Sequence, residues 1–192
     1  MSQETHKRRR EPQINEKQQQ DEEEFRKLKM ANLNKSIVYD FDCEAYLRGQ
    51  CYRLQLSRIL QAFPYAILFF CGYAFTPQLK DDLRHIEEHY QHFVELGALP
   101  IAITQDQIQV QWAYATPGTV TGSLDFTPSF LLASDGIDRL ITRSFKSMNL
   151  DTLELQRSVI VVDGNLHILF NHKVAKNRFF PIQSLLNCFE SH

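Results

Sequence analysis

The sequence predicts an α/β domain in which a central mixed sheet lies between layers of helices. Two apolar runs, 65–71 and 99–104, have the length and continuous hydrophobicity of strands buried on both faces of a sheet. The segment 77–96 between them has apolar residues every three or four positions, which is typical of an amphipathic helix. Two later runs, 157–162 and 166–171, flank Asp-Gly-Asn, a strong β-hairpin signal.

Composition favours one globular domain and excludes several classes of protein. Of the 192 residues, 43% are hydrophobic and 11% aromatic, which is enough to bury a core. The net charge of −2 and the pI near 6.4 argue against binding nucleic acid through bulk positive charge. The longest apolar stretch, Ala66 to Cys71, is far shorter than the ~20 residues that cross a bilayer. We therefore expect neither nucleic acid nor a membrane as a partner.

The first 35 residues differ from the rest of the chain. Residues 1–30 contain 8 Lys or Arg and 7 Asp or Glu, with very few apolar side chains. Such a segment cannot bury enough apolar surface to offset the entropy of ordering it. The prediction is a charged tail over 1–35, disordered or partly helical, followed by a folded domain over 36–192.

The tail carries the basic cluster Lys7-Arg8-Arg9-Arg10. No apolar stretch of a signal peptide follows it, so an intracellular and most simply cytoplasmic location is expected. Four adjacent basic residues also resemble a nuclear-localisation motif, although a solvated basic patch has the same composition. A nuclear role through Lys7–Arg10 is the weaker alternative.

The remaining elements follow from local signals. At the start of the domain, 36–41 is a predicted strand with 52–56 as its hairpin partner, and Ser57 can cap a short helix over 58–62. Thr76-Pro77 suits the start of the long helix. After the second central strand the predicted elements are a helix over 105–114, an irregular segment, a strand over 129–133, a helix over 137–145 and, at the end, a helix over 181–189. This order is that of the thioredoxin fold with an insertion.

Three short segments within these elements resemble the sequences of one protein family. The segments are Ala66-Ile-Leu-Phe-Phe-Cys-Gly-Tyr-Ala-Phe-Thr-Pro77, Glu95-Leu-Gly-Ala-Leu-Pro-Ile-Ala-Ile-Thr104 and Arg157-Ser-Val-Ile-Val-Val-Asp-Gly-Asn-Leu-His-Ile168. They resemble the peroxiredoxins, the alkyl hydroperoxide reductase C / thiol-specific antioxidant family. Trp112, Thr116-Pro117 and Asn177-Arg178 are similar to its typical two-cysteine branch. The resemblance covers 36–190 and implies a thioredoxin-like, three-layer peroxiredoxin fold, with a homodimer or association with peroxiredoxins as the expected assembly.

The resemblance also implies where the family's chemistry would lie. Peroxiredoxins attack the peroxide O–O bond with a thiolate in the first turn of the long helix, where the helix dipole and a nearby Arg lower the cysteine pKa. The signature Pro-x-x-x-Thr-x-x-Cys corresponds here to Gly72 through Leu79. Thr76 is kept, whereas Leu79 occupies the nucleophile position; Thr76 and Arg157 match the peroxide-binding residues. Leucine has no lone pair, so the implied function is that of a degenerate, non-catalytic binding or regulatory scaffold.

A displaced thiol is the alternative, which would make the protein a thiol-dependent antioxidant oxidoreductase. Cys71 ends the first central strand, at the sheet edge where ligands gather in α/β proteins. A free cysteine is, however, more often a small core residue with an inert thiol. Cys43 and Cys51 flank the first hairpin turn and are either separate thiols or a regulatory disulfide. Cys188 is expected in or beside the core.

Three histidines on the long helix are the remaining candidates for chemistry. His85, His89 and His92 are spaced i, i+4 and i+7, and two His at i, i+4 can bind a metal. A polar helix face that includes Glu88 and Gln91 explains the same pattern, and no further ligand is clearly placed to complete a tetrahedral site. We therefore expect neither a metal nor a cofactor.

Overall fold

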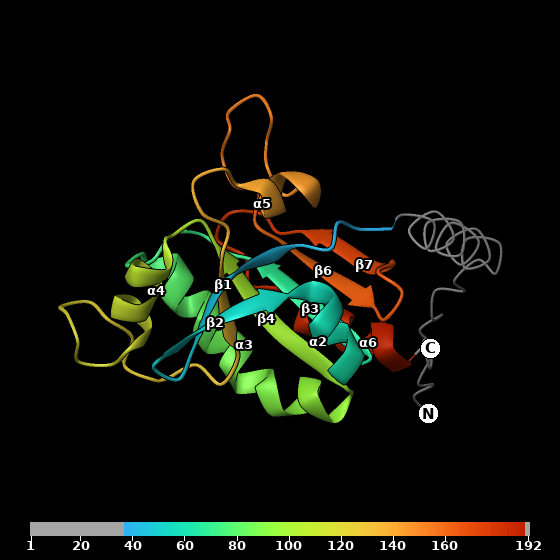
Figure 1. Ribbon diagram of the computed structural model, residues 1–192, viewed down its shortest axis with the longest axis horizontal. Coiled ribbons are helices and arrows are strands. Elements are labelled where there is room, and N and C mark those ends of the chain that lie inside the picture. Colours follow the sequence, from blue (N-terminus) through green and yellow to red (C-terminus); the bar gives the residue numbers. More distant parts are fainter. Residues whose placement is uncertain (1–36, 191–192) are drawn as a thin grey trace, which may run out of the picture.

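The computed structural model describes residues 37–190 as one seven-stranded sheet with helices on both faces (Figure 1). The strands are β1 Asp42–Leu47, β2 Gln50–Gln55, β3 Tyr65–Phe70, β4 Ala98–Thr104, β5 Leu131–Ser134, β6 Ser158–Asp163 and β7 Ile168–Lys173. The helices are α2 Leu56–Ala62, α3 Pro77–Glu95, α4 Ile108–Ala115, α5 Leu140–Ser144 and α6 Ile182–Glu190. The predicted tail 1–35 and the basic cluster Lys7–Arg10 lie outside the described residues.

The sheet is mixed, as predicted. Its order is β2-β1-β5-β4-β3-β6-β7. The central pairs β3/β4 and β4/β5 are parallel, whereas β3/β6, β6/β7, β1/β5 and β1/β2 are antiparallel. Every residue of β4 is buried, and so are all but the first of β3, as expected for strands covered on both faces.

The molecule has three layers, a central sheet with helices on each face, and one apolar core fills each of the two interfaces between sheet and helices. Because successive side chains of a strand point to opposite faces, Ile67 and Phe69 of β3 join one core while Leu68 and Phe70 join the other. The first core also contains the buried apolar residues of α3, α4 and α6. The second contains those of α2 and Ile141 of α5. This arrangement confirms the three-layer prediction.

The two central strands, the long helix between them and the last hairpin lie within three residues of their predicted bounds. α3 begins at Pro77 with Thr76 as its N-cap. The Asp163-Gly164-Asn165 hairpin joins β6 and β7, and the Asp163 carboxylate accepts hydrogen bonds from the backbone N–H groups of Asn165 and His167 at 2.9 and 2.8 Å. No helix among residues 37–190 is both long and apolar enough to span a membrane.

The first hairpin differs from the prediction. Its first strand is β1, which lies after the predicted 36–41, whereas β2 is within two residues of the predicted 52–56; Arg48 and Gly49 join the two strands. Both turn residues have positive φ, 48° and 86°, the backbone of a tight two-residue hairpin loop. β1 pairs with β5 on its other side, so its register depends on a strand far along the sequence. Ile37, assigned to the first strand, is 72% exposed and makes only an isolated bridge to His167.

The corrected register also separates two cysteines. Cys43 lies opposite Leu54, whereas Cys51 lies opposite Tyr46. Cross-strand partners share a face, so the two thiols point to opposite faces of the hairpin. Cys43 is buried, Cys51 is exposed and both are free thiols. The alternative of a disulfide between them is wrong.

Two predicted helices are shorter than expected. The helix expected over 137–145 is limited to α5. It begins only at Leu140, because the preceding Arg139 has a left-handed backbone conformation with φ of 51°. The helix expected from 105 begins at Ile108. Ser134, on β5, donates to the carbonyl of Asp106 at 2.7 Å, which ties the segment before α4 to the sheet.

Candidate functional site

Thr76 closes the N-terminus of α3. Its Oγ1 accepts a hydrogen bond from the backbone N–H of Leu79 at 3.3 Å and donates one to the carbonyl of Tyr73 at 2.7 Å. The preceding Phe75 has a φ of 60°, in the left-handed region, so the loop turns sharply into the helix. Thr76 therefore acts as an N-cap, at the helix start that Thr76-Pro77 predicted.

Leu79 lies in the first turn of α3 and points into the first core. It is only 1% exposed and belongs to the same apolar cluster as Phe69, Cys71 and Leu83. Its side chain has neither a donor nor an acceptor, so it adds only apolar contact at this point of the helix.

Arg157 meets Asp82, from the second turn of α3, in a buried ion pair that we call the arginine corner. The guanidinium donates from Nε to Asp82 Oδ2 at 3.0 Å and from Nη2 to Oδ1 at 2.5 Å. Its Nη1 donates to the carbonyls of Arg178 and Ala175 at 3.1 and 3.4 Å, and its charge lies 5.0 Å from the ring centre of Phe180. Both terminal nitrogens and Nε are thus used within the protein.

Asp82 is a site residue that the sequence motifs did not single out. In the structure it is fully buried. The signal that could have found it is its spacing: Asp82 is three residues after Leu79 and four before Ile86, within the buried stripe. A carboxylate in such a stripe requires a cationic partner.

Burial controls the ionisation of this corner. Burial raises the pKa of Asp82 to about 6, and the charge and hydrogen bonds of Arg157 oppose that rise. Cys71 is also fully buried, and burial raises its thiol pKa well above the usual value. The Asp82 carboxylate adds to this rise, while Arg157 works against it. The Cys71 thiol donates weakly to the carbonyl of Phe69 at 3.4 Å. It is consequently protonated at neutral pH and closed to solvent.

The other thiols lie elsewhere. Burial raises the pKa of Cys43 to about 12 and also raises that of Cys188. Cys51, on β2, is exposed. The structure therefore brings Thr76, Leu79, Asp82 and Arg157 together around the start of α3, with Cys71 beneath them in the same core.

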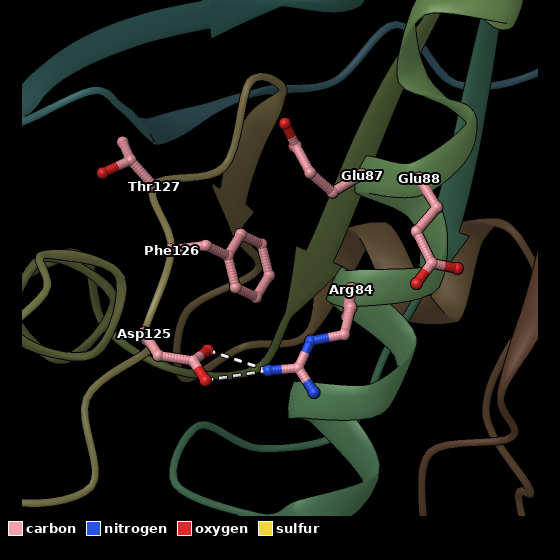
Figure 2. A pocket seen from close by; sticks show the side chains of 6 residues that line it. All are labelled: Arg84, Glu87, Glu88, Asp125, Phe126 and Thr127. Carbon is pink, nitrogen blue, oxygen red and sulfur yellow. Dashed lines mark hydrogen bonds and ion pairs between the residues drawn. The ribbon is translucent and has the colours of Figure 1, made fainter.

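An open hollow of about 400 Å³ lies beside the outer surface of α3 (Figure 2). Figure 2 shows Arg84 reaching from the helix to Asp125, whose two oxygens it meets at 2.9 Å each. Lys80 adds a contact of 3.3 Å to the same carboxylate, and Glu87 accepts from the backbone and hydroxyl of Ser129 at 2.8 and 2.7 Å. The charges of the hollow are thus largely paired among themselves, and none of the residues of the α3 N-terminus lines it.

Farther along α3, the structure brings two of the three expected histidines together. His85 and His89 form a group with Glu88, whereas His92 is not part of it.

Comparison with known proteins identifies the fold family. The model of the AhpC/TSA family matches residues 35–170, more than two thirds of the sequence. The chain belongs to the AhpC/TSA family.

Solved structures of AhpC and of 2-Cys peroxiredoxins have the same fold. Enterococcus faecalis AhpC superposes with a TM-score of 0.69 at 22% identity, covering 83% of this chain and 91% of that one. The mitochondrial 2-Cys peroxiredoxin of Plasmodium falciparum gives 0.70 at 17% identity, covering 83% and 93%. The reduced 2-Cys peroxiredoxin of Plasmodium vivax gives 0.72 at 16% identity, covering 82% and 80%. No curated protein sequence matches the chain.

These comparisons confirm the thioredoxin-like, peroxiredoxin-type fold that the resemblance of the sequence segments implied. At sequence identities of 16–22%, the similarity shows a shared fold but does not establish a shared reaction. For this AhpC/TSA-family chain the activity has to be argued from its own residues.

Proposed function

We propose that this chain is a degenerate member of the AhpC/TSA family that works as a non-catalytic binding or regulatory scaffold. Leu79 carries the proposal. It lies three residues after the capping Thr76, in the first turn of α3, where the family signature places the peroxide-reducing cysteine. A leucine side chain cannot attack a peroxide oxygen or form a sulfenic acid.

The residues around Leu79 support the same conclusion. Thr76 uses its hydroxyl as a cap, and Arg157 directs its guanidinium at Asp82 and two carbonyls. Donors that would hold a peroxide are therefore already occupied by the protein's own acceptors. The arrangement stabilises the fold and leaves neither the Thr76 hydroxyl nor the Arg157 guanidinium free for a substrate.

The alternative function is a thiol peroxidase that uses Cys71. In its favour, Cys71 lies near enough to Asp82 and Arg157 for both charges to affect its pKa. Against it, the thiol is fully buried and its pKa is raised, and a peroxidatic thiol has to be an accessible thiolate.

A scaffold needs a partner, and we propose a second copy of the chain or a peroxiredoxin. Tyr73 and Phe75, in the loop before α3, are 46% and 44% exposed. Contacts within the protein hold both side chains in place. The centre of the Phe75 ring lies 4.9 Å from that of Tyr114, and Arg139 donates a hydrogen bond to the Tyr73 hydroxyl at 3.1 Å. Ordered aromatic side chains on a surface are typical of protein interfaces. The proposed location is cytoplasmic, with a nuclear role through Lys7–Arg10 as the weaker possibility.

Brief exposure of the reduced protein to hydrogen peroxide, with a sulfenic-acid trap present, tests the proposal by intact mass. We expect no adduct at peroxide levels that saturate an active peroxiredoxin. One adduct that maps to Cys71 and disappears in Cys71→Ser would instead establish the alternative. An adduct on the exposed Cys51 that needs prolonged exposure would be ordinary surface oxidation, distinguished by its slow rate.

Leu79→Cys is the complementary variant. A thiol there is as buried as the leucine it replaces, but it lies at a helix N-terminus, which favours the thiolate, so we expect its trapped adduct to form faster than one on a thiol farther along the helix. Leu83→Cys is the matched control, because it makes the same change one turn later at a similarly buried position of α3. Equal reactivity of the two variants would show that position 79 has no special environment.

A further inference from the structure

Two histidines and a glutamate lie together on the outer surface of α3, and we call them the histidine cluster: His85, Glu88 and His89. Each offers one ligand atom, and these atoms all lie within 4.8 Å of one another. The spacing i, i+3 and i+4 places all three on one face of the helix. The proposed scaffold function uses none of them.

The ring of His89 is oriented as in metal sites. Its Nδ1 lies 2.9 Å from the backbone carbonyl of His85. A carbonyl can only accept, so Nδ1 carries the proton and Nε2 keeps its lone pair. Metal-binding histidines commonly donate their second ring N–H to a carbonyl in this way, which fixes both the tautomer and the ring orientation.

His85 is held from two sides. Its ring lies 4.9 Å from the His89 ring at an interplanar angle of 73° and 5.2 Å from the ring of Phe179. Its Nδ1 is 3.7 Å from a carboxylate oxygen of Glu88. Two ligands at tetrahedral positions on one zinc ion are roughly 3.4 Å apart, so this pair is already near the spacing that a shared ion requires.

The neighbouring positive charges on α3 are paired with an acid, which lowers their repulsion of a metal ion. The neighbouring cations Arg84 and Lys80 are both engaged by Asp125. Glu87 is bound to Ser129, so among the acids of this helix surface it is Glu88, with 59% of its side chain exposed, that can turn toward the two rings.

We propose that His85, Glu88 and His89 bind a divalent transition-metal ion of the zinc class. Two imidazole nitrogens and one carboxylate oxygen are a donor set that Zn²⁺ accepts, whereas Mg²⁺ and Ca²⁺ prefer oxygen alone. Water completes the coordination, so the site is open on its solvent side. His92, which the sequence spacing grouped with the other two histidines, is not a ligand.

Calorimetric titration of the full-length chain with zinc chloride tests the site. We expect one ion per chain, and at least about tenfold weaker binding in His89→Gln and in Glu88→Gln. His92→Gln is the matched control, since it removes an imidazole from the same helix outside the cluster, and it should bind as the wild type does. Absence of binding at millimolar zinc, or equal losses in His92→Gln and His89→Gln, would overturn the proposal.

Two further measurements distinguish loss of the metal site from misfolding of a variant. Circular dichroism checks that each variant keeps its helix content. X-ray absorption at the zinc edge of the loaded wild-type protein should show nitrogen and oxygen neighbours with imidazole scattering. A sulfur neighbour would assign the ion to a cysteine and overturn the proposal even if zinc binds tightly.

Discussion

The arginine corner and the histidine cluster lie on consecutive turns of α3, yet they satisfy their polar groups in opposite ways. Asp82 is fully buried and holds Arg157 through two hydrogen bonds, so the corner is complete within the protein. His85 and His89 are half-buried and Glu88 is exposed, and one ligand atom from each lies within 4.8 Å of the others. Leu79 and the arginine corner are thus closed off within the protein, while the proposed metal site begins one turn after Asp82.

The contrast follows from the helix period. Positions 79, 82, 83 and 86 return to the side of α3 that packs on the sheet, whereas 85, 88 and 89 lie at its margin. A polar group on the inner side has to find a partner in the protein, because water cannot reach it. A polar group at the margin is under no such requirement.

The largest expected effect comes from breaking the corner. Asp82→Asn turns an amide NH2 toward the N–H donors of Arg157 and leaves one of them without an acceptor, and we expect the free energy of unfolding to fall by about 3 kcal/mol. Urea denaturation measures this loss. Asp81→Asn, at the exposed neighbouring position, is the control and should change stability by less than about 0.5 kcal/mol. Similar losses in the two variants would show that the corner is not a buried ion pair.

The second effect is a pH dependence specific to Asp82. Its folded pKa is about 6 against an ordinary value of 3.8, so its stabilising contribution is complete below pH 3.8 and is lost as pH rises through 6. The difference amounts to something on the order of 3 kcal/mol. The stability of the wild type relative to Asp82→Asn should therefore increase as pH is lowered from 7 to 4.

Urea denaturation of both proteins at each pH makes this comparison, since the titration of all other groups is common to both. A stability difference that stays constant, or one that shrinks toward acid pH, would contradict a raised Asp82 pKa.

A smaller effect tests the cap of the helix. Thr76→Ala removes the acceptor for the Leu79 N–H and should cost about 1 kcal/mol of unfolding free energy. Thr76→Ser keeps the hydroxyl and should retain most of that stability. If serine and alanine behaved alike in thermal unfolding, the hydroxyl of Thr76 would have a role other than capping.

The smallest effect is expected in the histidine cluster. In metal-free protein, His89→Gln should leave the free energy of unfolding within about 0.5 kcal/mol of the wild type, because the side chain is only half-buried. Chemical denaturation in the presence of a chelator measures it. A loss as large as that of Asp82→Asn would mean that the cluster is part of the core and would remove the contrast between the two turns.

Much of the fold could be predicted from local pattern. Continuous apolar runs marked β3 and β4, a three-to-four residue period marked α3, and Asp-Gly marked the last hairpin, because each signal depends on neighbours within a few residues. The first hairpin was misplaced. Its register depends on the Arg48-Gly49 turn and on pairing with β5, whose partner residues lie 86 and 88 positions downstream.

The candidate site divides in the same way. The sequence by itself determined that α3 starts at Thr76-Pro77 and that position 79 is apolar, since both are read from neighbouring residues alone. Only the tertiary structure decided that Arg157 is bound by Asp82, 75 positions away, and that Glu88 rather than His92 joins His85 and His89. Sequence periodicity says which side of a helix a residue occupies, whereas packing and side-chain direction decide which group it meets.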